Sequence, residues 1–183
     1  MDLFLGTRLN TGSYGTQTEN YILTNDGNGV FKDVSEVYLG ENKSMGMVTD
    51  SEFVDIDLDG IDELIVVGEW MPIGVYKINK GKLINISSDL GLEKSNGLYN
   101  TLEVVINKDS FPDIIIGNHG LNSFFNASRE YPLTMYVNDF DGNGRNEQIL
   151  GLYYGDDLYP VVQLKDLWMQ IPSLKKQFLK FEN

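Results

Sequence analysis

The chain of 183 residues contains no cysteine, a single histidine and no long apolar run. The absence of cysteine excludes disulfides, zinc–thiolate sites and thiol nucleophiles, but it does not fix the compartment, because large secreted β proteins also do without cysteine. The longest apolar stretches, residues 64–67 and 114–116, are far shorter than the roughly 20 residues that span a bilayer. We therefore expect a soluble, globular chain without a membrane-spanning helix.

Basic residues are also scarce, since 14 Lys and Arg face 27 Asp and Glu and the formal net charge is −13. Such a chain repels the phosphates of nucleic acids, and no basic stripe offsets this repulsion locally. We therefore expect no nucleic-acid partner, and divalent cations are the natural counter-charge.

One short pattern occurs four times: an acidic residue, three or four mostly apolar residues, and then a glycine. Each apolar stretch is short and rich in β-branched residues, which favours a strand buried on both faces over a helix. The repeats are unevenly spaced, so the units between them differ in length. The four copies are residues 2–6, 63–68, 113–117 and 147–151.

The second copy belongs to a longer unit for which the pattern predicts four strands and a tight turn at residues 79–81. The predicted strands are residues 51–57, 63–68, 73–78 and 82–87. Four-stranded units that cannot bury their faces alone are typical of propeller blades. We therefore predict an all-β fold, a partial β-propeller of about three irregular four-stranded blades over residues 1–160.

The character of the chain changes after residue 160, where apolar residues recur at helical spacing. Pro172 is expected to end the first helix or to open a second one, because proline is tolerated only in the first turn of a helix. We predict a short C-terminal helical tail over residues 161–183. Its apolar positions are Leu164, Leu167, Trp168 and Ile171, followed by Leu174, Phe178 and Leu179.

Residues 55–63 give the strongest chemical signal, because carboxylates alternate along a turn with glycine at its sixth place. Calcium takes six to eight oxygen ligands, and carboxylates crowded on a curved loop repel one another without a cation. An EF-hand is excluded, because its twelfth place is Val66 instead of Glu and a strand follows instead of a helix. The predicted ligands are the side chains of Asp55, Asp57, Asp59 and Glu63 with the carbonyl of Ile61.

Residues 139–147 repeat this spacing, and they predict a second structural calcium site. Residues 105–113 occupy the same place in their unit, but they lack the first carboxylate and the glycine, so we expect no strong calcium site there. For each loop the alternative is a solvated acidic turn without a metal. The predicted ligands of the second site are Asp139, Asp141, Asn143 and Glu147 with the carbonyl of Arg145.

The combination of acidic loop, short buried strand and glycine resembles the FG-GAP and VCBS repeats of integrin α-like propellers over about residues 1–155. The turns at residues 25–35 and 117–123 are similar to those of large secreted bacterial VCBS-repeat proteins, often lipoproteins with an ASPIC/UnbV module. The resemblance implies a seven-bladed propeller, calcium at the blade loops, an extracellular or cell-surface location, and a role in adhesion or ligand binding.

Seven blades need far more than 183 residues, and Asp2 stands at the ninth place of a loop whose first eight places are missing. We therefore expect a fragment of a larger protein, so the lack of signal-peptide features in its first residues carries no information. The expected partners are neighbouring propeller blades, an unidentified protein or glycan ligand, and a second copy through open edge strands.

A catalytic constellation is not apparent, because His119 lies in a glycine turn and the clustered carboxylates are assigned to calcium. We expect a non-catalytic binding or scaffolding surface. The alternative is part of a calcium-dependent propeller enzyme, a lyase or hydrolase acting on polysaccharide. Aromatic residues that can stack on a ligand or pack between blades are Trp70, Tyr99, Tyr153, Tyr154 and Tyr159.

Overall fold

The computed structural model describes residues 2–107, 109, 111–120 and 122–177 and divides into two compact units. Unit 1 comprises Met1–Asn10 and Gln17–His119, and unit 2 comprises Thr11–Thr16 and Gly120–Asn183. Strands dominate both units, and every strand pairing among the described residues is antiparallel. The predicted β-rich class is confirmed. The sheets stay open, so the partial propeller remains a prediction.

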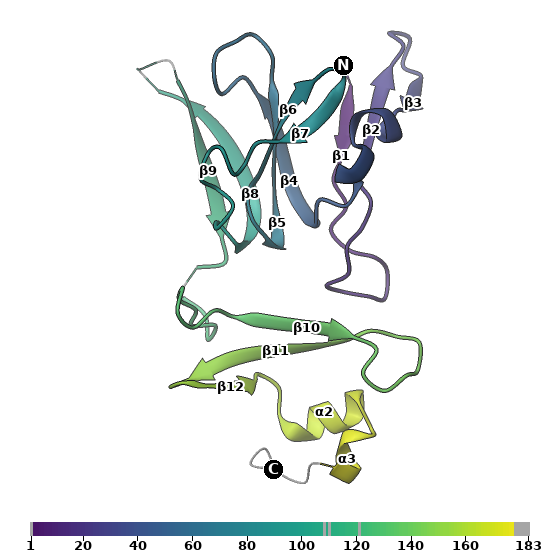
Figure 1. Ribbon diagram of the computed structural model, residues 1–183, viewed down its shortest axis with the longest axis vertical. Helices are drawn as coiled ribbons and strands as arrows, with labels where there is room; N and C mark the ends of the chain where they lie inside the picture. The colour runs from purple at the N-terminus through teal and green to yellow at the C-terminus, as the bar shows by residue number, and fades with distance from the viewer. Residues whose placement is uncertain (1, 108, 110, 121, 178–183) are drawn as a thin grey trace. The chain divides into compact units, whose positions relative to one another are not determined.

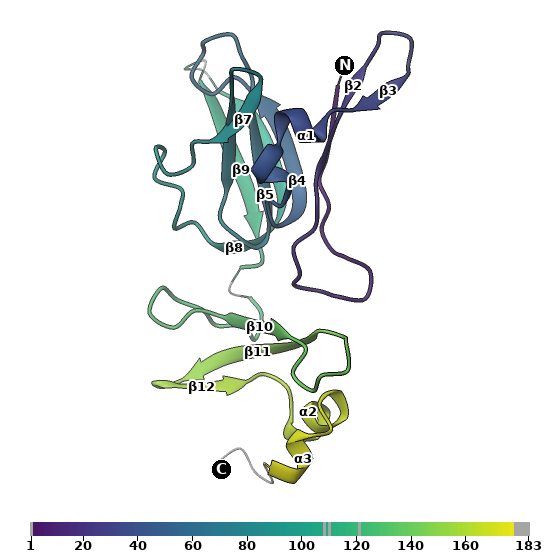
Figure 2. The same cartoon turned by 45° about the vertical axis from the view of Figure 1, so that its right-hand side comes forward.

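Unit 1 begins with a three-stranded sheet of order β1-β2-β3. A short helix α1 (Ser35–Tyr38) and a 3₁₀ helix η1 (Gly40–Lys43) follow it. Helix α1 lies against β2 and β7, as Figure 2 illustrates. The strands of this sheet are β1 (Leu3–Leu5), β2 (Tyr21–Asn25) and β3 (Phe31–Asp33).

The centre of unit 1 is a four-stranded meander in which each strand pairs with the next (Figure 1). All four strands predicted for this stretch are present, and the strand expected over residues 51–57 begins earlier and ends at Val54. Lys80 and Gly81, both with positive φ, form the predicted tight turn. The strands are β4 (Met47–Val54), β5 (Glu63–Met71), β6 (Gly74–Asn79) and β7 (Lys82–Asn85).

Strands β8 (Gly97–Ile106) and β9 (Pro112–Asn118) complete unit 1. They pair with each other along their length, whereas β8 pairs with β5 only where Leu98 meets Glu69 and Gly97 meets Met71. Most of β8 was not predicted from the sequence. Its backbone is tied to β4, since Leu102 N–H donates to Asp50 Oδ2 at 2.8 Å.

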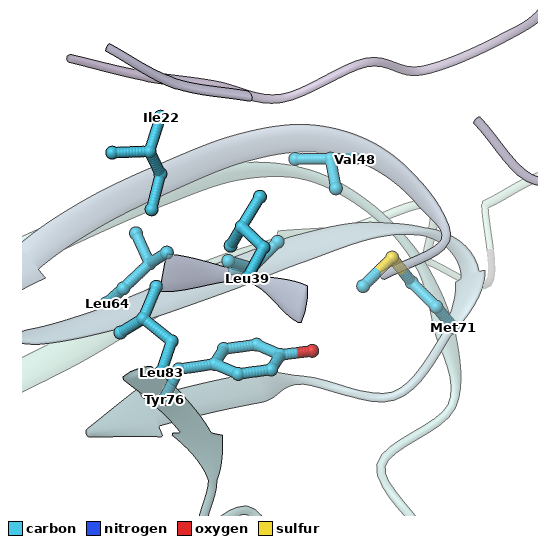
Figure 3. Packing of buried hydrophobic residues seen from close by; sticks show 8 residues of the cluster. Ile22, Leu39, Val48, Leu64, Met71, Tyr76 and Leu83 are labelled. Atoms are coloured by element: carbon cyan, nitrogen blue, oxygen red, sulfur yellow. The ribbon is translucent and has the colours of Figure 1, made fainter. Parts of the chain in front are cut away.

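Strand β5 is buried on both faces, as its unbroken apolar run predicts. On one face Leu64 and Val66 pack against β2, β4, β6 and β7, and Figure 3 shows Ile22 directed from β2 towards Leu64. On the other face Ile65 and Val67 pack against Tyr99 and Leu102 of β8 and further apolar residues. Apolar side chains therefore cover both faces of β5. The labelled members of the first cluster are Ile22, Leu39, Val48, Leu64, Met71, Tyr76 and Leu83.

Unit 2 combines a three-stranded sheet of order β10-β11-β12 with two short helices. Leu152, Leu167 and Ile171 are its buried apolar residues. The change from strands to helices falls after residue 160, as expected. Phe178 and Leu179, two apolar positions predicted for the second helix, lie outside the described residues. The elements are β10 (Thr134–Asn138), β11 (Glu147–Tyr154), β12 (Asp157–Pro160), α2 (Leu164–Gln170) and α3 (Leu174–Gln177).

None of the helices in the described part of the chain has the length and apolar character needed to cross a membrane. This agrees with the short apolar stretches of the sequence.

The packing of β5 predicts a large penalty for truncating its side chains. Ile65 is fully buried, so Ile65→Ala should lower the free energy of unfolding by about 2–5 kcal/mol through lost burial and a residual cavity. Ile106 is 73% exposed, so the matched change Ile106→Ala should cost less than about 1 kcal/mol. Urea unfolding of both variants measures the difference. Equal penalties would contradict the described core.

Candidate metal centres

Both predicted calcium loops connect two antiparallel strands of a sheet. Residues 55–62 join β4 to β5, and Val54 pairs with Glu63 at the base of the loop. Residues 139–146 join β10 to β11, and Asn138 pairs with Glu147 in the same way. In each loop the ninth residue is therefore the first residue of a strand, and the strand predicted to follow the first loop is present.

The two loops share one backbone conformation. The fourth and sixth places have positive φ in both, at Leu58 (60°) and Gly60 (87°) in the first loop and at Gly142 (74°) and Gly144 (83°) in the second. Two left-handed residues separated by one other residue curl the chain sharply, which turns the alternate side chains inward. Leu58 is the strained member, because leucine rarely adopts this conformation.

Backbone N–H groups inside the first loop hold its carboxylates in place. Asp55 accepts from Asp59 N–H with Oδ1 (3.0 Å) and from Gly60 N–H with Oδ2 (2.8 Å). Asp57 Oδ1 accepts from Asp59 N–H at 3.3 Å, and Asp59 Oδ1 accepts from Ile61 N–H at 2.9 Å. Asp57 and Asp59 therefore each keep one oxygen, Oδ2, outside this backbone network.

The second loop repeats this network position by position. Asp139 accepts from Asn143 N–H with Oδ1 (2.9 Å) and from Gly144 N–H with Oδ2 (2.8 Å). Asp141 Oδ1 accepts from Asn143 N–H at 3.2 Å, and Asn143 Oδ1 accepts from Arg145 N–H at 2.8 Å. The repeated spacing in the sequence thus corresponds to a repeated structure.

The ninth-place glutamates are the buried acids of the two loops. Glu63 is 0% exposed and Glu147 is 6% exposed. The Oε2 atom of Glu63 accepts from Ile56 N–H at 3.1 Å, and that of Glu147 accepts from Phe140 N–H at 2.9 Å. Glu63 Oε1 is buried without a hydrogen-bond partner. A buried carboxylate oxygen without a hydrogen bond is costly unless a cation lies beside it, so this atom needs a positively charged partner.

A lysine from β6 supplies positive charge at the first loop. Lys77 Nζ lies 2.6 Å from Asp57 Oδ2, 2.7 Å from Asp59 Oδ2 and 3.4 Å from Glu63 Oε1. The hydrogen bonds with Asp57 and then Asp59 raise the pKa of Lys77. The hydrogen bond from Lys77, followed by that from the Ile61 N–H, lowers the pKa of Asp59. Lys77 was not predicted as a site residue.

The structure brings most of the predicted side-chain ligands together. Oxygen atoms of Asp55, Asp57 and Asp59 lie within 4.8 Å of one another, as do those of a second group of three acids. Each group can hold a metal ion. The carbonyls of Ile61 and Arg145 remain predicted ligands. The second group consists of Asp139, Asp141 and Glu147.

The degenerate loop between β8 and β9 keeps part of the same hydrogen-bond pattern. Asn107 Oδ1 accepts from Asp109 N–H at 2.7 Å, and Asp109 Oδ1 accepts from Phe111 N–H at 3.0 Å. The Asn107 side-chain amide donates to Asp113 Oδ2 at 2.6 Å. A side-chain N–H therefore donates a hydrogen bond to the ninth-place carboxylate of this loop.

The aromatic residues considered as ligand contacts divide into buried or half-buried residues and one exposed pair. Trp70 lies in β5 and is half-buried. Tyr99 is buried in the core of unit 1 and belongs to the packing. Tyr154 and Tyr159 of unit 2 are exposed and pack edge to face with ring centres 6.1 Å apart, while Tyr153 packs against Tyr131 at 5.3 Å. The exposed pair of Tyr154 and Tyr159 is therefore available to a ligand.

No protein-family model, curated protein or solved structure matches the chain. The resemblance to FG-GAP and VCBS repeats therefore stays a prediction, which rests on the sequence pattern.

Because the fourth place of each loop has a left-handed conformation, substitutions there should change stability in opposite directions in the two loops. Leu58→Asn should raise the free energy of unfolding by about 0.5–1 kcal/mol, because asparagine adopts the left-handed region readily and Leu58 is half exposed. Gly142→Leu should lower it by about 1–2 kcal/mol through backbone strain alone, since an added Cβ meets no atom. Urea unfolding in chelator measures both. Destabilisation by Leu58→Asn would contradict this conformation.

Proposed function

We propose that this chain is a non-catalytic, calcium-binding segment of a β-propeller in an exported protein, and that its surface serves adhesion, ligand binding or scaffolding. The observation that carries the proposal is the repetition of one acidic loop, with the same internal hydrogen bonds and a buried ninth-place glutamate, in two separate sheets. The resemblance to FG-GAP and VCBS repeats supplies the propeller and the extracellular location.

The chemistry of the ligands supports calcium. The side chains at places one, three, five and nine offer oxygen only, apart from the amide of Asn143, and hard oxygen ligands suit calcium and magnesium. Calcium accepts an irregular shell of six to eight oxygens, whereas magnesium demands near-ideal octahedral geometry. A curved loop with carboxylates at alternate places fits the more permissive ion.

The position of the loops supports a structural role for the ion. Each loop closes a pair of antiparallel strands, and its ninth residue, a buried glutamate, begins the second strand of that pair. An ion bound to places one, three, five and nine would fasten the end of one strand to the start of the next. Binding of the ion would therefore raise the free energy of unfolding.

Calcium should raise the melting temperature of the chain, because an ion that binds only the folded state stabilises that state. At a concentration 100 times the Kd the gain is about 2.7 kcal/mol. Asp141→Ala should remove most of the part contributed by the second loop, since Asp141 belongs to its group of three acids. Differential scanning calorimetry with calcium and with chelator measures this.

The matched control is Asp157→Ala on β12, an exposed acid outside both loops, which should leave the calcium-induced shift unchanged. If the melting temperature is the same in calcium and in chelator, both loops are solvated acidic turns and the proposal is wrong.

A ligand surface is the second part of the proposal, and the exposed pair of Tyr154 and Tyr159 is its strongest candidate, because aromatic faces stack on sugars and fill protein interfaces. On a glycan and protein-ligand array, Tyr154→Ala should weaken binding at least about tenfold. Tyr136→Ala removes another exposed tyrosine, on β10, and is the control. Turnover of a bound polysaccharide would replace this proposal with the enzyme alternative.

A further inference from the structure

The first acidic loop differs from the second because a lysine contacts the carboxylate oxygens that its backbone N–H groups leave free. In the first loop Lys77 Nζ contacts Asp57 Oδ2, Asp59 Oδ2 and Glu63 Oε1. These are the oxygens that the backbone N–H groups of the loop leave unused. The ammonium group of Lys77 therefore contacts the same three oxygens that a bound cation would need as ligands.

The position of Lys77 follows from the sheet. Leu64 of β5 pairs with Tyr76 of β6, so the next residues, Glu63 and Lys77, lie across from each other at the edge of the loop. The Lys77 side chain is 28% exposed, which places its stem along the sheet and its ammonium over the carboxylates. Glu63 Oε1 is buried, has no hydrogen-bond partner and points to this position.

In the described part of the chain, the second loop has no such competitor. Strand β12 ends at Pro160, which pairs with Gly151, so no residue of that strand faces Glu147. Within the described ranges, no lysine or arginine forms an ion pair with the three acids of the second loop, Asp139, Asp141 and Glu147. Its carboxylates are therefore held by the backbone network without an ion-pair partner among the described residues.

We propose that Lys77 is an intramolecular competitor for the divalent cation, so that the first loop binds calcium more weakly than the second. The inference rests on the proposed calcium function and concerns the order in which the two loops fill. Calcium must displace the ammonium from Asp57, Asp59 and Glu63, so the apparent affinity falls by the fraction of molecules in which Lys77 has left. Without calcium, Lys77 balances the charge of the first loop and keeps it folded.

The competition reverses the ranking that the sequence suggests. The first loop carries carboxylates at places one, three, five and nine, whereas the second has the neutral Asn143 at place five. Ligand charge alone would make the first loop the tighter site. Lys77 offsets the higher ligand charge of the first loop, because its ammonium group lies within hydrogen-bonding distance of two of the aspartates.

Calcium titration calorimetry of the full chain tests the proposal. In an Asp141→Asn background, which disables the second loop, the first loop is measured alone. Lys77→Met should raise its calcium affinity at least about tenfold, a coupling typical of two ligands that exclude each other. Lys77→Arg keeps a cation at the site and should leave the affinity low. Lys82→Met removes an exposed lysine from the neighbouring strand and should change nothing.

Melting curves give an independent readout. In chelator, Lys77→Met should melt below the unaltered chain, because Glu63 and its neighbours lose their counter-charge, and calcium should produce a larger upward shift in the variant than in the unaltered chain. An unchanged or weaker calcium affinity in Lys77→Met would overturn the competition. Calcium binding at neither loop of the unaltered chain would instead overturn the proposed function itself.

Discussion

The burial of one carboxylate at the start of a strand is the constraint on which each acidic loop depends. Glu63 begins β5, whose two faces are both covered, and Glu147 begins β11. Burying a carboxylate is costly unless hydrogen bonds or a positive partner compensate it. The second residue of each loop supplies one hydrogen bond to its glutamate, and at Glu63 the other carboxylate oxygen faces Lys77.

The two loops meet this need with the same backbone framework but with different surroundings for the glutamate. The backbone N–H groups fix the carboxylates before any ion is bound, which reduces the ordering that binding would require. At Glu63 the positive partner is Lys77, whereas no lysine or arginine in the described part of the chain forms an ion pair with Glu147. At the exposed Asp113 a side-chain amide donates to the carboxylate. The same loop framework can therefore hold an ion pair or, as proposed, a metal ion.

The sequence predicted the parts of the structure that depend on local pattern. The unbroken apolar run of β5, the alternating acids of the two loops and the helical spacing that begins at Leu164 each carried enough information. Lys77 was missed because its place at the site depends on the register between β5 and β6. That register is set by the connection around Pro72, whose geometry no sequence pattern specifies. Strand β8 was missed because Asn100 and Thr101 interrupt its apolar residues, and its packing on β5 is a tertiary effect.

The most direct test of the account is a crystal structure of the chain grown with millimolar calcium. The account predicts an ion at the second loop, with carboxylate oxygens of Asp139, Asp141 and Glu147 at about 2.3–2.6 Å and the Asn143 and Arg145 oxygens completing the shell. A second loop that keeps its hydrogen-bond network in millimolar calcium, with only water between its carboxylates, would contradict it.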